Sequence, residues 1–219
     1  MKREFIFLGP PACGKGTQTN TLSEYLGFPH IDTGSLLRAE IAKETEEGLI
    51  AKSFIDKGQL VPIDLVATII GKKLAGDDCK KGYVLDGYPR SIEQAEKLEL
   101  INAKVDGNEE VSFKAIYFDI DTEILIDRIV NRQSCPVCGE IYNKKFKPSK
   151  VENICDKCNV ALKTRDDDTE DVARKRFDTY FEQTAPLIEF YEKKGVLYKL
   201  DANGSIEDVW ERLLKIVEA

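Results

Sequence analysis

The residues from Gly9 to Thr17, GPPACGKGT, have the composition and spacing of a loop that binds phosphate. Glycines let backbone N–H groups turn toward an anion, and a helix that begins in the loop adds the positive end of its dipole. Lys15 adds a full charge, although Gly16 stands where Ser or Thr is usual and the hydroxyl comes one residue later. Glycine-rich turns between a strand and a helix also occur without ligands. The preceding apolar run and the lysine favour a nucleotide-phosphate site.

A second candidate group follows the apolar run at residues 82–86, where Asp86 ends an expected strand. In phosphate-loop enzymes a carboxylate at such a position commonly organises Mg²⁺ near the phosphates. Arg90 follows across a Gly-Tyr-Pro turn, and its planar guanidinium can donate two parallel hydrogen bonds to a phosphate. Taken alone, these would be a turn aspartate and a surface arginine. Together with the phosphate loop, they indicate a functional pocket.

Four of the six cysteines form two CxxC pairs with the spacing C-x2-C-x16-C-x2-C: Cys135, Cys138, Cys155 and Cys158. Four thiolates so arranged favour a tetrahedral Zn²⁺ ion. The intervening segment is polar and lysine-rich, so a metal would supply folding energy that it lacks. Two disulfides or an iron–sulfur cluster are the alternatives. Because a four-thiolate site leaves no open coordination position, we expect a structural metal.

The elements that must position these groups alternate between strands and helices. The alternation predicts an α/β fold with a parallel sheet covered on both faces. Expected strands lie at residues 5–8, 28–31, 82–86, 115–118 and 196–200. Expected helices lie at residues 17–26, 122–132 and 169–194, and two more begin at residues 91 and 205. A further helix is expected to begin at residues 36–38, and the helical pattern continues with breaks through residues 39–75.

Composition restricts the possible partners and location of the chain. The 219 residues carry a net charge of −7, which argues against a nucleic acid or an anionic membrane as the main partner. No apolar run has the length of a membrane span or of a signal peptide, so a cytoplasmic protein is expected.

Several stretches together resemble the adenylate kinases of the bacterial, long-lid kind. They are GPPACGKGTQ, PHIDTGSLLR, GQLVP, GYVLDGYPRSIEQA, IDRIVNR, CPVCGEIYNKKFKPSKVENICDKC and TRDDDTEDVARKR. The resemblance implies the nucleoside monophosphate kinase fold, with a parallel five-stranded sheet flanked by helices. It also implies a core at residues 1–31, 62–130 and 169–219, an AMP-binding helical insert at 32–61 and a zinc-bearing lid at 131–168.

The activity that the resemblance implies is reversible, magnesium-dependent phosphoryl transfer from ATP to AMP, giving two ADP. The transfer is direct and in line, and lids close over both substrates to exclude water. The resemblance also implies a monomer that uses Mg²⁺ with ATP and carries a structural Zn²⁺.

By the same resemblance, each matching position receives an expected role. ATP binding falls to Ala12, Cys13, Gly14, Lys15, Gly16, Thr17, Arg132, Ile141, Tyr142 and Gly204. AMP binding falls to Thr33, Arg38, Gln59, Leu60, Val61, Gly87, Tyr88, Pro89, Arg90, Gln94, Arg165 and Arg176. Catalysis falls to Lys15, Asp86, Arg90, Arg128, Arg132, Arg165 and Arg176, and the metal to the four cysteines. Asp167 and Asp168 match acids at the base of the lid. Arg128 and Arg132 are expected to share one helix face.

Three positions depart from the family pattern. Ala12 replaces a glycine, and a positive φ there would cost roughly 1–2 kcal/mol. Ser35 replaces an aspartate but can still cap a helix. Asn131 replaces a glycine and tolerates left-handed geometry. Cys13 is expected either to be a reactive thiol or to pack into the core, whereas the histidine His30 is expected to pack at a strand end.

Two other functions stay open at this stage. One is another nucleoside monophosphate kinase, with UMP, CMP or GMP as the acceptor; Thr33 and Gln94 favour AMP instead. The other is a non-catalytic zinc-ribbon binding protein on a degenerate ATPase. The net acidity and the lack of base-stacking aromatics in the lid weigh against it.

Overall fold

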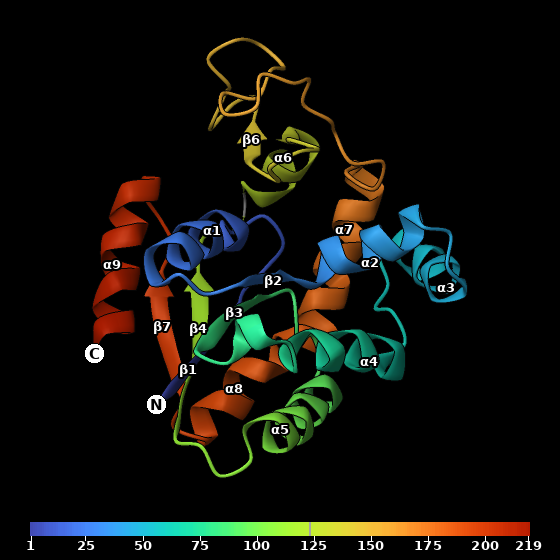
Figure 1. Ribbon diagram of the computed structural model, residues 1–219. Helices are drawn as coiled ribbons and strands as arrows, with labels where there is room; N and C mark the ends of the chain where they lie inside the picture. The colour runs from blue at the N-terminus through green and yellow to red at the C-terminus, as the bar shows by residue number, and fades with distance from the viewer. Residues whose placement is uncertain (123) are drawn as a thin grey trace.

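A computed structural model of the chain describes residues 1–122 and 124–219 (Figure 1). Its centre is a five-stranded sheet in the order β2-β3-β1-β4-β7, and every pairing in it is parallel. The predicted α/β fold is therefore confirmed. The strands are β1 (Lys2–Leu8), β2 (His30–Asp32), β3 (Gly82–Asp86), β4 (Val111–Asp119) and β7 (Leu197–Asp201).

Alternation along the buried strand β1 divides the core into two layers. Phe5 and Phe7 pack on one face of the sheet, whereas Ile6 and Leu8 pack on the other. The Phe5 face is covered by α1 (Lys15–Leu26), α6 (Leu125–Val130), α7 (Glu170–Thr179) and α9 (Ile206–Glu218). The Ile6 face is covered by α4 (Ile63–Leu74), α5 (Ile92–Asp106) and α8 (Pro186–Lys193).

Two segments project from this core (Figure 1). Residues 32–61 form α2 (Thr33–Ala42) and α3 (Glu46–Ile55), and residues 131–168 carry an antiparallel pair, β5 (Arg132–Ser134) and β6 (Ile141–Asn143). Whether these segments act as separate units stays a prediction. A short 3-10 turn spans Asp77–Cys79. Within the described residues, none of the helices has the length and hydrophobicity to cross a bilayer.

The expected helix at residues 169–194 is interrupted. Between α7 and α8 lies a π-helical turn, Tyr180–Thr184, in which the Ala185 N–H donates to the Tyr180 carbonyl at 2.8 Å. Pro186 has no N–H and begins α8, as proline does at a first helical position. One extra residue in a turn rotates the next helical segment by about 100°. The turn therefore directs the Thr184 side chain toward the loop that follows β3, where its hydroxyl donates to the Arg90 carbonyl.

Three local expectations need correction. Asp32, not Ser35, caps α2, and its carboxylate accepts from the Gly34 and Ser35 N–H groups at 3.0 Å. Asn131 has a φ of −97°, so its tolerance of left-handed geometry is not used. The helix expected at 122–132 is shorter, because α6 ends at Val130; residue 123 of that range lies outside the described residues.

Gly48 allows α3 to pack against α2, and its replacement provides a stability test. A Cβ at Gly48 would lie 2.3 Å from the Glu40 carbonyl oxygen, whereas a Cβ at Gly71 in α4 would meet nothing closer than 3.8 Å. We expect Gly48→Ala to lower the free energy of unfolding by about 1–3 kcal/mol through overpacking. Gly71→Ala should not destabilise, since alanine favours helix. Chemical denaturation measures both, and equal stabilities would contradict the packing account.

Candidate active site

A cavity of about 1190 Å³ lies beside the phosphate loop, and a second cavity of about 70 Å³ adjoins it. The residues that line both cavities include Arg38, Leu60, Gly87, Arg90 and Arg176. Every residue that the sequence assigned to ATP, AMP or catalysis lines one cavity or both. The structure thus brings together groups that lie up to about 190 positions apart in the sequence, which spacing alone could not show.

The phosphate loop is built around three residues with positive φ: Gly9 at 147°, Ala12 at 62° and Gly14 at 100°. The value at Ala12 confirms that the non-glycine residue sits in a left-handed conformation. Lys15 begins α1, and its ammonium donates to the Gly9 carbonyl at 2.8 Å and the Pro10 carbonyl at 2.9 Å. The lysine charge is therefore folded back over the loop.

Cys13 is buried within this loop, with 3% of its surface exposed. Its sulfur lies 3.4 Å from the Lys15 ammonium. Burial agrees with the packing alternative for this cysteine. Its reactivity toward alkylating agents stays a hypothesis.

Gly16 has a steric reason to lack a side chain. A Cβ there would lie 3.1 Å from the Ile141 Cδ1 atom of the lid strand and 3.5 Å from an Asp86 carboxylate oxygen. The phosphate loop, the end of β3 and the lid strand thus meet at one point. A side chain at position 16 would therefore require the Ile141 side chain to shift.

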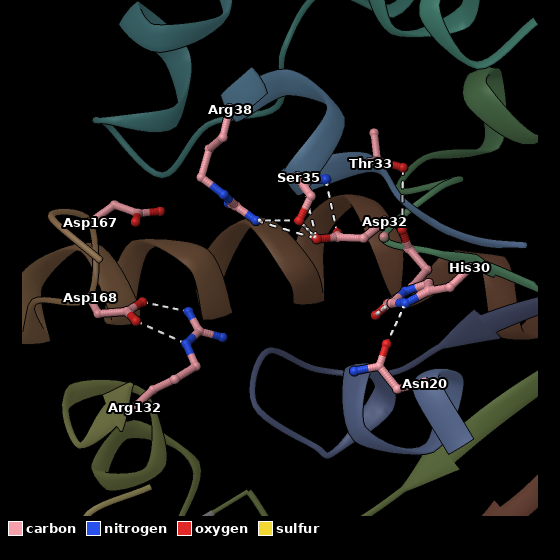
Figure 2. A network of polar contacts seen from close by, with 12 residues as sticks. Asn20, His30, Asp32, Thr33, Ser35, Arg38, Arg132, Asp167 and Asp168 are labelled. Carbon is pink, nitrogen blue, oxygen red and sulfur yellow. Dashed lines mark hydrogen bonds and ion pairs between the residues drawn. The ribbon is translucent and has the colours of Figure 1, made fainter. Parts of the chain in front are cut away.

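Asp86 is almost fully buried at this meeting point. Burial raises the pKa of its carboxyl, and the Lys15 charge partly offsets that rise. The Asp86 Oδ2 atom lies 4.0 Å from Nε2 of His30, whose Nδ1 atom lies 2.7 Å from the Asn20 side-chain oxygen. Figure 2 shows the contact between His30 and Asn20, with Asp32 nearby. His30 therefore makes polar contacts as well as the packing that was expected.

Two aspartates hold two of the cavity arginines. Arg132 makes a two-pronged contact with Asp168, from Nε to Oδ2 at 2.9 Å and from Nη2 to Oδ1 at 2.5 Å (Figure 2). Arg176 reaches Asp168 at 3.3 Å and also pairs with Asp167. Arg132 starts β5, so the helix face it was expected to share with Arg128 does not exist; the two still line the same cavity.

The remaining cavity arginines have weaker partners. Arg38 lies 3.4 Å from an Asp32 oxygen, as Figure 2 shows, and Arg90 donates to the Gly87 carbonyl at 2.8 Å. The Arg128 guanidinium lies over the Phe146 ring at 5.3 Å, and its buried Nε atom has no hydrogen-bond partner among the described residues.

Burial and mutual repulsion act on these guanidinium groups. Burial, followed by the charges of Arg132 and Arg90, lowers the pKa of Arg176 to about 9. Burial and the Arg132 charge lower the pKa of Arg165 to about 10. Both groups remain protonated at neutral pH. The cluster is stable only with counter-charge, so a polyanion such as linked phosphates would complement it.

In the turn after β3, the backbone of Arg90 is held at both ends. Its N–H donates to the Gln94 side-chain oxygen at 2.7 Å, and its carbonyl accepts from the Thr184 hydroxyl at 2.7 Å. Thr184 belongs to the π turn and was missed by the sequence analysis, because nothing in its neighbourhood signals that turn. The Thr33 hydroxyl donates to the Asp86 carbonyl at 3.2 Å (Figure 2).

The four lid cysteines converge, with their sulfur atoms within 4.8 Å of one another. They are free thiols, which disagrees with the disulfide alternative. Four convergent sulfur donors fit the tetrahedral preference of a soft metal ion, so the cluster could bind zinc. Tyr142 lines the large cavity, yet its hydroxyl is directed at Cys155 within the lid.

Comparison with known proteins decides the family. The adenylate kinase family model matches residues 7–196. The chain belongs to the adenylate kinase family. Curated adenylate kinases from Fervidobacterium nodosum and Archaeoglobus fulgidus are 44% and 43% identical, each over 97% of this chain, covering 96% and 97% of those proteins. One from Thermotoga neapolitana is 40% identical over 99% of this chain and 98% of its own length.

Membership in the adenylate kinase family makes this chain an ATP:AMP phosphotransferase and implies ATP, AMP and ADP as its substrates. Adenylate kinases use Mg²⁺ with ATP. The two alternatives, a kinase for another nucleoside monophosphate and a zinc-ribbon binding protein, are not favoured by these matches.

Asp168 offers a test of how the arginines are held in the absence of substrate. It is buried and contacts both Arg132 and Arg176. Asp168→Asn should lower the free energy of unfolding by about 1–3 kcal/mol, since it removes charge-assisted hydrogen bonds. Asp178→Asn on the exposed side of α7 is the matched control and should have almost no effect. A thermal melt in which the two variants behave alike would contradict this assignment.

Proposed function

We propose that the chain transfers the terminal phosphoryl group of ATP directly to the phosphate of AMP within the 1190 Å³ cavity. One observation carries the proposal: Lys15 and arginines from separate elements line a single cavity. The reaction brings two anionic nucleotides end to end, and the charge on the transferring group spreads over its outer oxygens. Positioning and charge stabilisation therefore supply the catalysis, without a covalent enzyme intermediate.

The ATP side is assigned to the phosphate loop and the lid. The loop residues Ala12 to Thr17 direct N–H groups at the β- and γ-phosphates, and Lys15 swings from the Gly9 and Pro10 carbonyls to the phosphates. Ile141 and Tyr142 of the lid and Gly204 before α9 border the adenine. Asp86 would hold Mg²⁺, which when bound supplies charge neutralisation between the phosphates.

The AMP side is assigned to α2, the residues that follow α3 and the turn after β3. Thr33 and the backbone of Gln59, Leu60 and Val61 contact the base, and Arg38 and Arg90 bind the phosphate. The smaller cavity, lined by these residues together with Gly87, Tyr88 and Gln94, supports the assignment. Pro89 lines the larger cavity beside them.

The remaining arginines are assigned to the transferring group. Arg128, Arg132, Arg165 and Arg176 line the large cavity from α6, the lid and α7. Arg132 and Arg176 bind Asp168, and in the proposed reaction they exchange this carboxylate for phosphate oxygens as the lid closes. Closure also excludes water, which competes with AMP as the acceptor.

The proposal also covers the metal, the location and the assembly state. Zn²⁺ is assigned to the four lid thiolates as a structural ion. We assign the chain to the cytoplasm as a monomer that acts on small molecules, with no nucleic acid or membrane as a partner. Free thiols at all six cysteines are compatible with a reducing compartment.

The reaction can be tested by offering ATP with AMP, UMP, CMP or GMP to the purified chain. We expect ADP formation with AMP to exceed that with the other acceptors. If UMP, CMP or GMP were the better acceptor, or if only hydrolysis occurred, the assignment would be wrong.

Arg90 can be tested by a change that keeps its charge. Gln94 and Thr184 hold the Arg90 backbone, so Arg90→Lys should leave the turn intact while removing the two-pronged donor. We expect kcat/KM for AMP to fall by about 10–100-fold, the value of one charge-assisted hydrogen bond. Arg174→Lys is the control, because Arg174 is exposed on α7 and pairs only with Glu170 among the ion pairs of the described residues. If the two variants had equal kcat/KM values for AMP, Arg90 would not be part of the AMP site.

Metal removal provides a further prediction. Because the lid cluster contains few buried apolar residues, its folding should depend on the metal. Chelation should lower the melting temperature and the turnover number while leaving ATP affinity at the phosphate loop largely unchanged. A metal-stripped sample that melts and turns over like the untreated protein would refute the structural role.

A further inference from the structure

The Tyr142 hydroxyl occupies an unusual place between the lid strand and the metal knuckle. Only 3% of the residue is exposed, and its ring packs with Cys135, Cys155 and Leu162. The hydroxyl oxygen lies 3.6 Å from Cys155 Sγ and accepts a hydrogen bond from the Asp156 N–H at 2.9 Å. No nucleotide role uses this hydroxyl.

These two contacts fix the direction of the hydroxyl proton. A phenol has one proton to donate, and its oxygen accepts through lone pairs. Because the Asp156 N–H occupies the acceptor side, the proton is left to point at Cys155 Sγ. The same sulfur also accepts from the Cys158 N–H at 3.4 Å. A metal-bound cysteine is a thiolate and therefore a better acceptor than a thiol.

Tyr142 also connects the second cysteine pair to the cavity. It pairs with Gln133 in the β5–β6 ladder, and its neighbours in that ladder are Arg132 opposite Asn143 and Ile141 opposite Ser134. Arg132 and Ile141 both line the large cavity. The hydroxyl thus joins the loop that holds Cys155 and Cys158 to the strand pair that faces ATP.

We propose that Tyr142 is a positioning residue for the lid metal: its hydroxyl donates a hydrogen bond to the Cys155 thiolate and so fixes the second knuckle to the β5–β6 pair. The inference rests on the proposed zinc site. Groups that hydrogen-bond to metal ligands orient those ligands and tune the metal, and their loss typically weakens metal affinity 10–100-fold.

The test compares full-length protein with Tyr142→Phe, which keeps the ring and removes one oxygen. Zn²⁺ affinity is measured by competition with a chromogenic chelator, and we expect it to fall about 10–100-fold. With Co²⁺ in the site, the sulfur-to-cobalt charge-transfer band should move to longer wavelength, since the thiolate loses a hydrogen bond that stabilised its lone pairs. A purely packing role of the ring would move neither quantity.

Tyr191→Phe is the matched control. Tyr191 is fully buried in the core with α4, α5 and α8, and its hydroxyl has no hydrogen-bond partner among the described residues. Its loss should leave metal affinity and the cobalt band unchanged. If Tyr142→Phe matches this control while both proteins hold Zn²⁺, the inference is wrong and the metal site stands. If the unmodified protein binds no Zn²⁺, the metal site and the inference fail together.

Discussion

The concentration of positive side chains around one cavity is the constraint on which this structure depends. Lys15, Arg38, Arg90, Arg128, Arg132, Arg165 and Arg176 line one cavity in a chain whose net charge is −7. Such groups repel one another, and five of them contact backbone carbonyls or Asp32, Asp167 and Asp168: Lys15, Arg38, Arg90, Arg132 and Arg176. Burial, followed by the charges of neighbouring arginines, lowers the pKa values of Arg165 and Arg176. We propose that substrate phosphates replace these carboxylates.

The fold makes this convergence possible. In a parallel sheet, the loops that follow the strands meet at one edge, so the phosphate loop after β1 and Asp86 at the end of β3 become neighbours. Gly16 lets these loops approach the lid strand closely. Helix α7 and the π turn then lead from residues 131–168 to the turn after β3, where Thr184 holds the Arg90 backbone.

The sequence predicts features that depend on short contiguous motifs, and it does not predict features that depend on contacts between distant segments. The phosphate loop, Asp86 and the paired cysteines were predictable because their chemistry lies in short contiguous motifs, and alternation of apolar runs was enough for the parallel sheet. The π turn and the inward hydroxyl of Tyr142 were not, because packing between distant segments sets them. Arg132 was placed on a helix for the same reason: local spacing cannot show that α6 ends at Val130 and that a strand begins.

The most direct measurement of the central claim is a crystal structure with a non-hydrolysable ATP analogue, Mg²⁺ and AMP bound together. The account predicts that Lys15 leaves the Gly9 and Pro10 carbonyls, that Arg132 and Arg176 leave Asp168 at least in part, and that the cavity arginines surround the phosphates of both nucleotides. Nucleotides bound elsewhere, or an arginine cluster still fully paired with its aspartates beside bound phosphates, would contradict it.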